Sequence, residues 1–203
     1  MRVLVVFNHP YEKSYCNAIL ESVKAGLAKG NHELDLIHLD QDEFDPVMRA
    51  KDLKAFVMAA KDLDASLNLV DSKVLDYKNR LELADHLVFI FPIWWELMPA
   101  LTKGFIDKVI FPGIAYDYNE KGNRLISKLK RLKGVTLVST MNTPKVLYWS
   151  IFGNAIKKAL LLGTFWKIGV PNRKWINLSS VKSVSQEKRA QWLSDIELRF
   201  QRL

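Results

Sequence analysis

Short apolar runs alternate with amphipathic segments along this chain of 203 residues. A run that is apolar at nearly every position is typical of a strand buried on both faces. Apolar positions three and four residues apart are typical of a helix with one buried face. Five strands are predicted on this basis, over Arg2–Phe7, Glu33–Leu39, Leu87–Phe91, Gly134–Thr140 and Lys174–Leu178. Helices are predicted over Cys16–Lys29, Asp52–Lys61, Ser72–Ala84, Pro99–Ile110, Tyr148–Leu162 and Gln186–Phe200.

The alternation of strand and helix predicts an α/β fold with a doubly wound, five-stranded parallel sheet. Strand–helix–strand units cross over with a right hand, so we expect helices on both faces of a sheet with the strand order 2-1-3-4-5. One long connection, from Asp40 to Val70, is more polar than the others. The length would also allow two small domains, but no interdomain linker is visible in the sequence. We therefore expect residues 1–203 to form a single domain.

The composition is that of a globular protein from a reducing compartment. Hydrophobic residues make up 49% of the sequence, and no stretch reaches the roughly 20 apolar residues that cross a bilayer. The apolar start of the chain meets Asn8-His9-Pro10 too early for a signal peptide. Cys16 is the one cysteine, which excludes an internal disulfide. These features predict a cytoplasmic protein without membrane insertion.

The net charge of +8 is unevenly distributed along the chain. Residues 1–100 carry 11 Lys and Arg against 16 Asp and Glu, whereas residues 101–203 carry 19 against 6. The densest basic run lies between Lys121 and Lys133. Such a run would attract a phosphorylated cofactor or a nucleic acid, but it also fits a solvated helix and loop before a strand. Because no nucleic-acid-binding module is visible, we expect no nucleic-acid partner.

The loop after the first strand has the composition of a phosphate site. It leads from His9 directly into a helix, whose first N–H groups are unpaired and carry partial positive charge. Lys13 adds a charge, and Ser14 and Asn17 add a hydroxyl and an amide. A simpler alternative is that Ser14 only caps the helix. The glycine-rich fingerprints of dinucleotide and nucleoside-triphosphate sites do not occur in the sequence.

Two further loops should meet this one at the carboxyl edge of the sheet. The third strand runs into Phe91-Pro92-Ile93-Trp94-Trp95, where Pro92 should stop the ladder and two adjacent indoles cannot both face one core. At least one indole should therefore project where such sheets bind ligands, as an apolar wall for a flat ring. After the fourth strand, Thr140-Met141-Asn142-Thr143 forms a polar loop, and Tyr148 follows. These three loops together predict one ligand crevice.

These motifs resemble the flavodoxin-like NAD(P)H:quinone oxidoreductase family, NAD(P)H dehydrogenase (quinone), over most of the chain. The tryptophan motif and the paired tyrosines of Ala115-Tyr116-Asp117-Tyr118 are the most specific parts. Phe44-Asp45-Pro46-Val47, Pro99-Ala100 and Lys103-Gly104-Phe105 also match. The resemblance implies a flavodoxin-like fold, a bound flavin and a homodimer.

The resemblance also implies roles for individual residues. Tyr148 would be the catalytic residue, placed near a flavin carbonyl, and Tyr116 and Tyr118 would close the substrate pocket of the neighbouring subunit. The phosphate loop, the ring-packing segment and the loop along the pyrimidine side of the ring would form the cofactor site. Its expected residues are His9, Lys13, Ser14, Tyr15, Asn17, Pro92, Ile93, Trp94, Trp95, Thr140, Met141, Asn142 and Thr143.

The implied activity is a two-electron, ping-pong transfer of hydride. NAD(P)H would reduce the flavin and leave, and a quinone or similar flat acceptor would then take the same place. Tyr148 and the loop N–H groups would stabilise the negative charge of the reduced ring. Some family members carry a histidine after the tyrosine, where this chain has Asn154, so a two-residue proton relay is not supported.

Several alternatives stay open at this point. The segment Phe44-Asp45-Pro46-Val47 is closer to the FAD-using branch, which favours FAD, with FMN as the alternative. An alternative function is that of a regulatory flavoprotein subunit of a partner such as a potassium-efflux system. The four histidines lack the spacing of a metal site, so no metal is expected. Cys16 near a helix start would suit a reactive thiol, although a small buried helix residue is the expectation.

Overall fold

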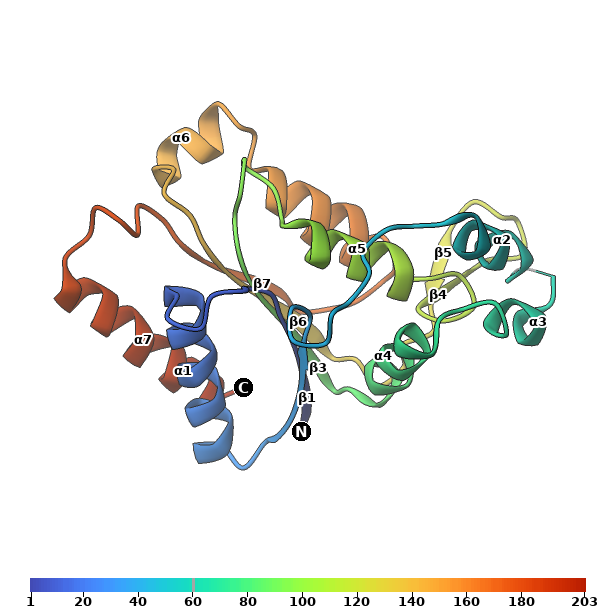
Figure 1. The fold of residues 1–203 in the computed structure, drawn as a ribbon, viewed down its shortest axis with the longest axis horizontal. Coiled ribbons are helices and arrows are strands. Elements are labelled where there is room, and N and C mark those ends of the chain that lie inside the picture. The colour runs from blue at the N-terminus through green and yellow to red at the C-terminus, as the bar shows by residue number, and fades with distance from the viewer. Residues whose placement is uncertain (60) are drawn as a thin grey trace.

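The computed structural model describes residues 1–59 and 61–203 and has the doubly wound α/β architecture that the sequence predicts (Figure 1). Its main sheet is parallel throughout, with the strand order β2-β1-β3-β6-β7. Counted over the strands of this sheet alone, that is the expected order 2-1-3-4-5. The strands are β1 (Arg2–Phe7), β2 (Glu33–His38), β3 (His86–Pro92), β6 (Gly134–Thr140) and β7 (Arg173–Leu178).

Helices cover both faces of this sheet, as expected. On one face α1 (Tyr15–Lys29) and α7 (Gln186–Gln201) pack side by side. On the other face lie α4 (Ser72–Leu83), α5 (Ala100–Val109) and the π-helix η1 (Lys157–Trp166). Three short helices are α2 (Ala50–Met58), α3 (Leu63–Leu67) and α6 (Lys145–Ser150). In the part of the chain that the structure describes, no helix is long and apolar enough to span a bilayer.

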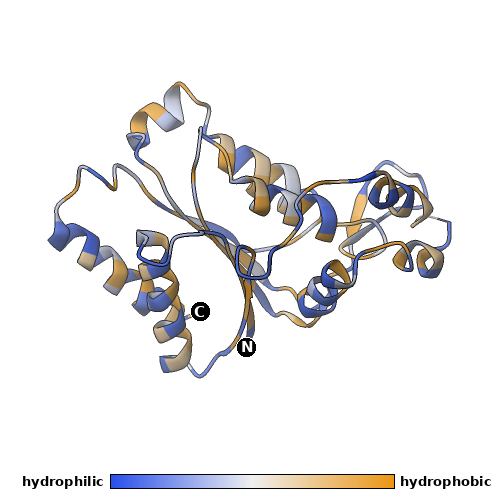
Figure 2. Ribbon diagram, in the orientation of Figure 1, coloured by the Kyte–Doolittle hydropathy of each residue, from blue (hydrophilic) through white to orange (hydrophobic). Residues whose placement is uncertain are grey.

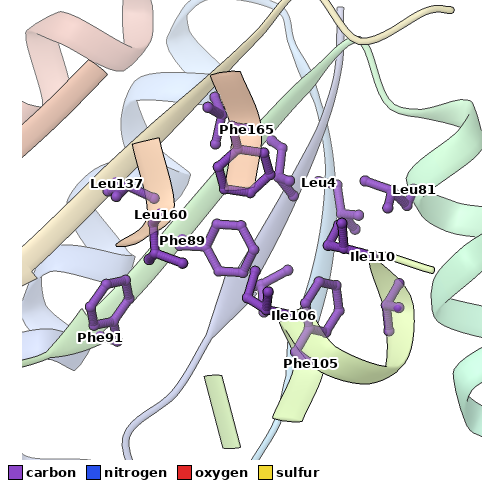
Figure 3. Packing of buried hydrophobic residues seen from close by; sticks show 14 of the residues in the cluster. Leu4, Leu81, Phe89, Phe91, Phe105, Ile106, Ile110, Leu137, Leu160 and Phe165 are labelled. Carbon is purple, nitrogen blue, oxygen red and sulfur yellow. The ribbon is translucent and has the colours of Figure 1, made fainter. Parts of the chain in front are cut away.

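Aromatic rings fill the space between the sheet and the second layer of helices (Figure 3). Phe89 of β3 lies between Phe105 of α5 and Phe165 of η1, at ring-centroid distances of 5.6 and 5.8 Å. All three side chains are fully buried. Burial of a side chain of this size stabilises the folded state by about 1.5–3 kcal/mol. This packing holds α5 and η1 against the sheet and so positions the loops at its carboxyl edge.

The third strand extends one residue further at each end than predicted, and Pro92 is its last paired residue. Pro92 pairs with Thr140, and the N–H of Ile93 still donates to the carbonyl of Thr140 at 2.7 Å. The missing N–H of Pro92 faces the side of β1, whose last bond to β3 runs from Asn8 N–H to the carbonyl of Ile90 at 3.0 Å. β3 therefore ends at Pro92, as the proline led us to expect, and the proline is tolerated as its last residue because the neighbouring strand has already ended.

The helix predicted over Tyr148–Leu162 is in fact two helices. α6 ends at Ser150 and η1 begins at Lys157. Between them Gly153 and Asn154 have φ values of 64° and 57°, in the left-handed region that a right-handed helix cannot contain. The apolar spacing continues across this break, which explains why periodicity alone predicts one helix.

Further differences lie in the long connections. The helix predicted over Asp52–Lys61 corresponds to α2, and residue 60 of that range lies outside the described residues. The pattern does not predict the antiparallel hairpin of β4 (Tyr116–Tyr118) and β5 (Leu125–Ser127). β5 lies inside the basic run between Lys121 and Lys133, for which a solvated helix and loop was one interpretation, and the structure, which describes all of that run, shows no helix in it. Strands of three residues are too short to show a period.

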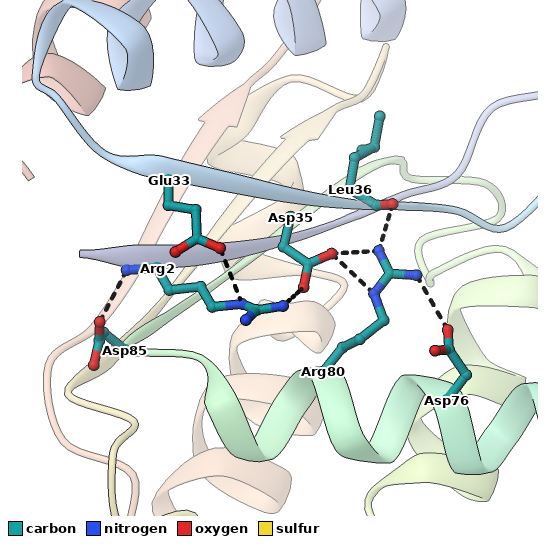
Figure 4. Close-up of polar contacts among 7 residues, drawn as sticks. All are labelled: Arg2, Glu33, Asp35, Leu36, Asp76, Arg80 and Asp85. Carbon is teal, nitrogen blue, oxygen red and sulfur yellow. Dashed lines mark hydrogen bonds and ion pairs between the residues drawn. The ribbon is translucent and has the colours of Figure 1, made fainter.

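Charged side chains tie β1, β2 and α4 together at one end of the sheet (Figure 4). The Asp35 carboxylate accepts hydrogen bonds from Arg2 Nη2 and Arg80 Nε, both at 2.8 Å. Arg80 also pairs with Asp76 at 3.3 Å. Burial raises the pKa of Asp35, but the hydrogen bonds and charges of Arg80 and Arg2 outweigh it, so this pKa lies below its usual value.

Candidate functional site

Three loops meet at the carboxyl ends of β1, β3 and β6. The imidazole of His9, after β1, lies edge-on to the indole of Trp94, after β3, with ring centroids 6.2 Å apart. Thr143, after β6, donates its hydroxyl hydrogen to Glu96 Oε1 at 2.7 Å. These contacts join loops that lie more than 40 residues apart in the sequence. The three loops that were expected to line a crevice at the switch point of the sheet therefore contact one another.

The loop after β1 is pre-organised by its own hydrogen bonds. Ser14 caps α1, and its Oγ accepts from both the backbone N–H and the side-chain amide of Asn17, each at 3.2 Å. The Asn17 amide also donates to the carbonyl of Tyr11 at 2.9 Å. The side chain of Asn17 is therefore engaged within the loop. An anion here would meet chiefly the first N–H groups of α1 and the exposed Lys13.

His9 at the rim of the crevice is favoured in its neutral form. Partial burial lowers the pKa of its imidazole, and the nearby charge of Asp40 only partly opposes that effect. The Nδ1 atom accepts a hydrogen bond from the backbone N–H of Tyr11 at 3.1 Å. The neutral ring therefore carries its hydrogen on Nε2, which is available to donate to a ligand.

Tyr15 and Cys16 face the protein interior. The Tyr15 hydroxyl donates to the carbonyl of Arg189 in α7 at 2.7 Å, and burial raises its pKa to about 12. Cys16 is buried, with its Sγ 3.4 Å from Thr140 Oγ1, and burial raises the pKa of this thiol to about 11. A thiol with such a pKa stays protonated near neutral pH, which favours the expected structural role for Cys16 over a reactive one.

The two tryptophans stand on a tight turn. Trp94 and Leu97 exchange backbone hydrogen bonds of 3.0 and 3.1 Å, with Trp95 and Glu96 between them at φ values of 49° and 64°. The side chain of Trp94 is 48% exposed and that of Trp95 is 97% exposed. Both indoles therefore project from the sheet, where the sequence required at least one to do so. Two large apolar side chains held in solvent suit a ligand or a partner better than a core.

Tyr148 lies beneath this turn. Its side chain is buried, its hydroxyl donates to the backbone carbonyl of Glu96 at 2.9 Å, and it accepts from the N–H of Ile156 at 3.0 Å. Burial raises the pKa of this hydroxyl, which keeps it protonated. The single hydroxyl hydrogen is thus committed to the turn. The catalytic role that the resemblance implies stays a prediction, and in this conformation it would require Tyr148 to exchange the Glu96 bond for one to the ligand.

Glu96 is the site residue that sequence reasoning missed. Its Oε1 accepts from Thr143, while its Oε2 is buried and has no hydrogen-bond partner among the described residues. A buried carboxylate oxygen without a partner costs free energy unless a ligand or water satisfies it. The sequence feature that could have indicated Glu96 is its position, because an acidic residue directly after two tryptophans is unexpected in an apolar surface.

The loop after β6 is partly engaged with the strand beside it. Met141 is buried, and its N–H donates to the carbonyl of Leu178 at 3.0 Å. The side-chain oxygen of Asn142 accepts from the N–H of Lys182 at 3.3 Å. Thr143 therefore presents its hydroxyl to the β3 turn, whereas the Thr140 hydroxyl lies against Cys16, and Met141 and Asn142 shape the loop itself.

Tyr116 and Tyr118 lie elsewhere, in a separate cavity of about 770 Å³. They stand on β4 with ring centroids 6.0 Å apart, and Trp166 at the end of η1 shares the cavity. Within one chain they are thus not part of the crevice of His9 and Trp94. No group of three or more potential metal ligands occurs among the described residues.

A doubly wound α/β fold whose loops meet at the switch point of a parallel sheet defines this class of protein. The family model described as "Flavodoxin-like fold" matches residues 1–200, and the chain belongs to that family. NAD(P)H dehydrogenase (quinone) 1 from Cavia porcellus is 26% identical over 125 residues, which are 58% of this chain and 46% of that protein. The resemblance inferred from the motifs is therefore confirmed.

Two solved structures show the same fold. The NAD(P)H:quinone oxidoreductase from Methanothermobacter marburgensis is 22% identical, with a TM-score of 0.84, and the match covers 99% of this chain and 96% of that one. The FMN-dependent NADH-azoreductase from Bacillus anthracis str. Ames Ancestor, in complex with FMN, is 14% identical with a TM-score of 0.76, covering 99% and 98%. The chain spans about half the length of most curated relatives that it matches.

Proposed function

We propose that this protein is a flavin-dependent NAD(P)H oxidoreductase that passes two electrons to quinones or similar flat acceptors in a ping-pong reaction. The observation that carries the proposal is the Trp94–Leu97 turn, which presents two exposed indoles beside His9 and the loop after β6. The names of the quinone-reducing relatives support the same activity.

The residues of the crevice fit a flavin. The first N–H groups of α1 and the charge of Lys13 would hold its phosphate. Trp94 would pack against the ring, and the Nε2–H of neutral His9 would donate to it. The partnerless Oε2 of Glu96 would accept a ring N–H. When bound, the flavin supplies the two-electron chemistry, and the protein supplies binding and electrostatics.

We propose FMN as the flavin to test first, although the sequence favoured FAD. The segment around Pro46 that suggested FAD has a packing role, because Gly104 of α5 lies directly against Pro46 and Lys108 donates to the carbonyls of Asp45 and Val47 at 3.2 Å. This packing accounts for the segment without a second nucleotide. The FMN complex of the Bacillus anthracis neighbour supports the same choice.

We also propose that two copies form a homodimer. The side chains of Val146, Trp149 and Ile151 around α6 are at least 69% exposed, and the exposed Trp95 stands on the turn that α6 contacts through Tyr148 and Glu96. Figure 2 shows hydrophobic residues on α6 although this helix lies at the periphery of the molecule. A second copy that covers this surface would remove apolar area from water, and its Tyr116 and Tyr118 would then be available to close the pocket.

The test is to purify the protein, record its visible spectrum and identify the released chromophore by mass. We expect a yellow protein that releases FMN, loses its colour with NAD(P)H under anaerobic conditions, and regains it when a quinone is added.

Trp94→Ala should weaken flavin binding by roughly 3- to 10-fold, since a stacking pair contributes about 0.5–1.5 kcal/mol, while Trp94→Phe keeps a ring and most of the affinity. Colourless protein that takes up neither FMN nor FAD would refute the proposal.

A further inference from the structure

The cavity that holds Tyr116 and Tyr118 has the size of a small-molecule site. It lies between the β4–β5 hairpin, the end of η1 and the start of β7, and its volume is about 770 Å³. Ligand pockets typically have volumes of roughly 300–1,000 Å³. Its aromatic residues are Tyr116, Tyr118 and Trp166, and the indole of Trp166 is 62% exposed. The two tyrosine rings meet edge to face, at 82°, so a planar ligand could stack on one of them and contact the edge of the other.

Three cationic side chains line the same cavity. Arg124 comes from the hairpin, Lys167 follows η1, and Arg173 begins β7. None of the three forms an ion pair within the described residues, although Arg173 also donates to the carbonyl of Val170. Cations from three separate segments thus converge on one hollow without a carboxylate to neutralise them.

The one acidic residue on β4 faces away from this cavity. Successive side chains of a strand point to opposite sides, so the side chain of Asp117 points away from the face that carries Tyr116 and Tyr118. Its carboxylate pairs with Lys128 at 3.2 Å, in a neighbouring hollow that Tyr118 also borders. No Asp or Glu occurs in the sequence from Lys121 to Gln186. The charged side chains that line the cavity are therefore all cationic.

We propose that this cavity binds a planar aromatic ring that carries an anionic group such as a carboxylate, sulfonate or phosphate. The ring would stack on one of the two perpendicular tyrosine rings or on Trp166, and the anionic group would be held by Arg124 and Arg173, whose guanidinium groups bind such oxyanions through two parallel hydrogen bonds. For the electron acceptor, this inference rests on the proposed function. It predicts that the enzyme prefers acidic quinones to neutral ones.

Isothermal titration of the purified protein with a naphthalenesulfonate tests this site, because the probe cannot be reduced. We expect saturable binding that weakens as salt is added, and much weaker binding of the neutral naphthalenesulfonamide. Arg124→Gln and Arg173→Gln should each raise Kd by roughly tenfold or more, since a hydrogen bond to a charged group contributes about 1.5–3 kcal/mol. Lys128→Gln, which alters a cation on the opposite side of the hairpin, should leave Kd unchanged.

The inference is overturned if the wild type does not bind the sulfonate, if it binds the sulfonamide equally well, or if Lys128→Gln weakens binding as much as the arginine variants do. Lys167→Gln and Arg124→Gln change exposed side chains, so they test the site even if Arg173→Gln fails to fold. A colourless protein that still binds the sulfonate would retain this site and refute only the flavin activity. A yellow protein that does not bind the sulfonate would retain the flavin activity and refute only this site.

Discussion

At the scale of single residues, Trp95 and Glu96 hold a backbone conformation that their side chains disfavour. A left-handed conformation costs a residue with a Cβ atom about 1–2 kcal/mol, and two such residues are adjacent in this turn. The compensating hydrogen bonds come from Tyr148 and Thr143, which both bind Glu96. The exposed indoles therefore depend on residues that follow a different strand. Strain of this kind is typical of functional sites.

Removal of the Tyr148 hydroxyl tests this dependence. Tyr148→Phe leaves the carbonyl of Glu96 and the N–H of Ile156 without their buried partner, so we expect the free energy of unfolding to fall by about 1–3 kcal/mol. Urea denaturation measures this loss. Tyr11→Phe, the same change at an exposed position, is the control and should alter stability by less than about 0.5 kcal/mol.

Flavin kinetics separate a positioning role of Tyr148 from the catalytic one. If the hydroxyl itself stabilises the reduced flavin, Tyr148→Phe should slow flavin reduction by roughly 10- to 150-fold while flavin affinity stays the same. If it only positions the turn, flavin affinity should fall together with stability. A variant with wild-type stability, affinity and rate would contradict both roles.

At the scale of elements, the segment between β2 and α2 is held by α5. The Lys108 ammonium is buried, lies 3.6 Å from Asp52 Oδ2, and donates to the carbonyls of Asp45 and Val47. One turn earlier on α5, Gly104 lets the backbone of Pro46 approach closely. The helix that begins after the tryptophan turn is thus fixed from its outer side as well as from the sheet.

A methyl group at Gly104 should disturb this contact. A Cβ atom added there would lie 2.3 Å from Pro46 Cα, so either the helix or the segment has to shift. We expect Gly104→Ala to destabilise the protein by about 1–3 kcal/mol, even though alanine favours helices. Lys103→Ala on the exposed side of the same helix removes only a pair with Asp107 and should cost less than about 0.5 kcal/mol. Thermal unfolding of both variants measures these losses, and equal stability of Gly104→Ala and Lys103→Ala would contradict the predicted steric conflict at Gly104.

At the scale of the whole molecule, acid sensitivity is located at the end of the sheet away from the crevice. His86 at the start of β3 is buried and shares a hydrogen bond of 2.9 Å with Thr136 Oγ1. Burial lowers the pKa of His86 to about 4, with a smaller contribution from the charge of Lys174. The ion pairs of Asp35 lie near this same end and lower the pKa of that carboxyl.

These shifts predict two pH windows. Above pH 6.5 His86 is neutral in both states, but as the pH falls towards 4 only the unfolded state takes up the proton, so stability should drop by up to about 3 kcal/mol. The stability from Asp35 is present above its unfolded pKa of about 3.9 and is lost as the pH falls through its lower folded pKa. Denaturation between neutral pH and pH 4 should show a reduced slope for His86→Gln. An unchanged slope would contradict the assignment.

The order of strands and helices was predictable from the sequence because buried strands and amphipathic helices leave distinct periods. β1 and β6 lie where the pattern places them, and α1 begins within one residue of its predicted start. The three loops of the crevice followed from this order, since parallel strands bring their carboxyl ends to one edge. Short or irregular elements did not follow: the β4–β5 hairpin has three-residue strands, and the break at Gly153 and Asn154 interrupts an otherwise continuous apolar pattern.

The sequence by itself determined the fold, the edge of the sheet that carries the site, and the exposure of at least one indole, because these depend on local patterns and on rules of strand connection. Only the tertiary structure decided that Glu96 joins the site with one carboxylate oxygen unsatisfied, and that the Tyr148 hydroxyl donates its hydrogen to the turn. It also decided that Tyr116 stands in a second cavity, which is lined by cationic side chains. Hydrogen-bond partners and cavities arise from contacts between distant segments, and residue spacing along the chain does not encode them.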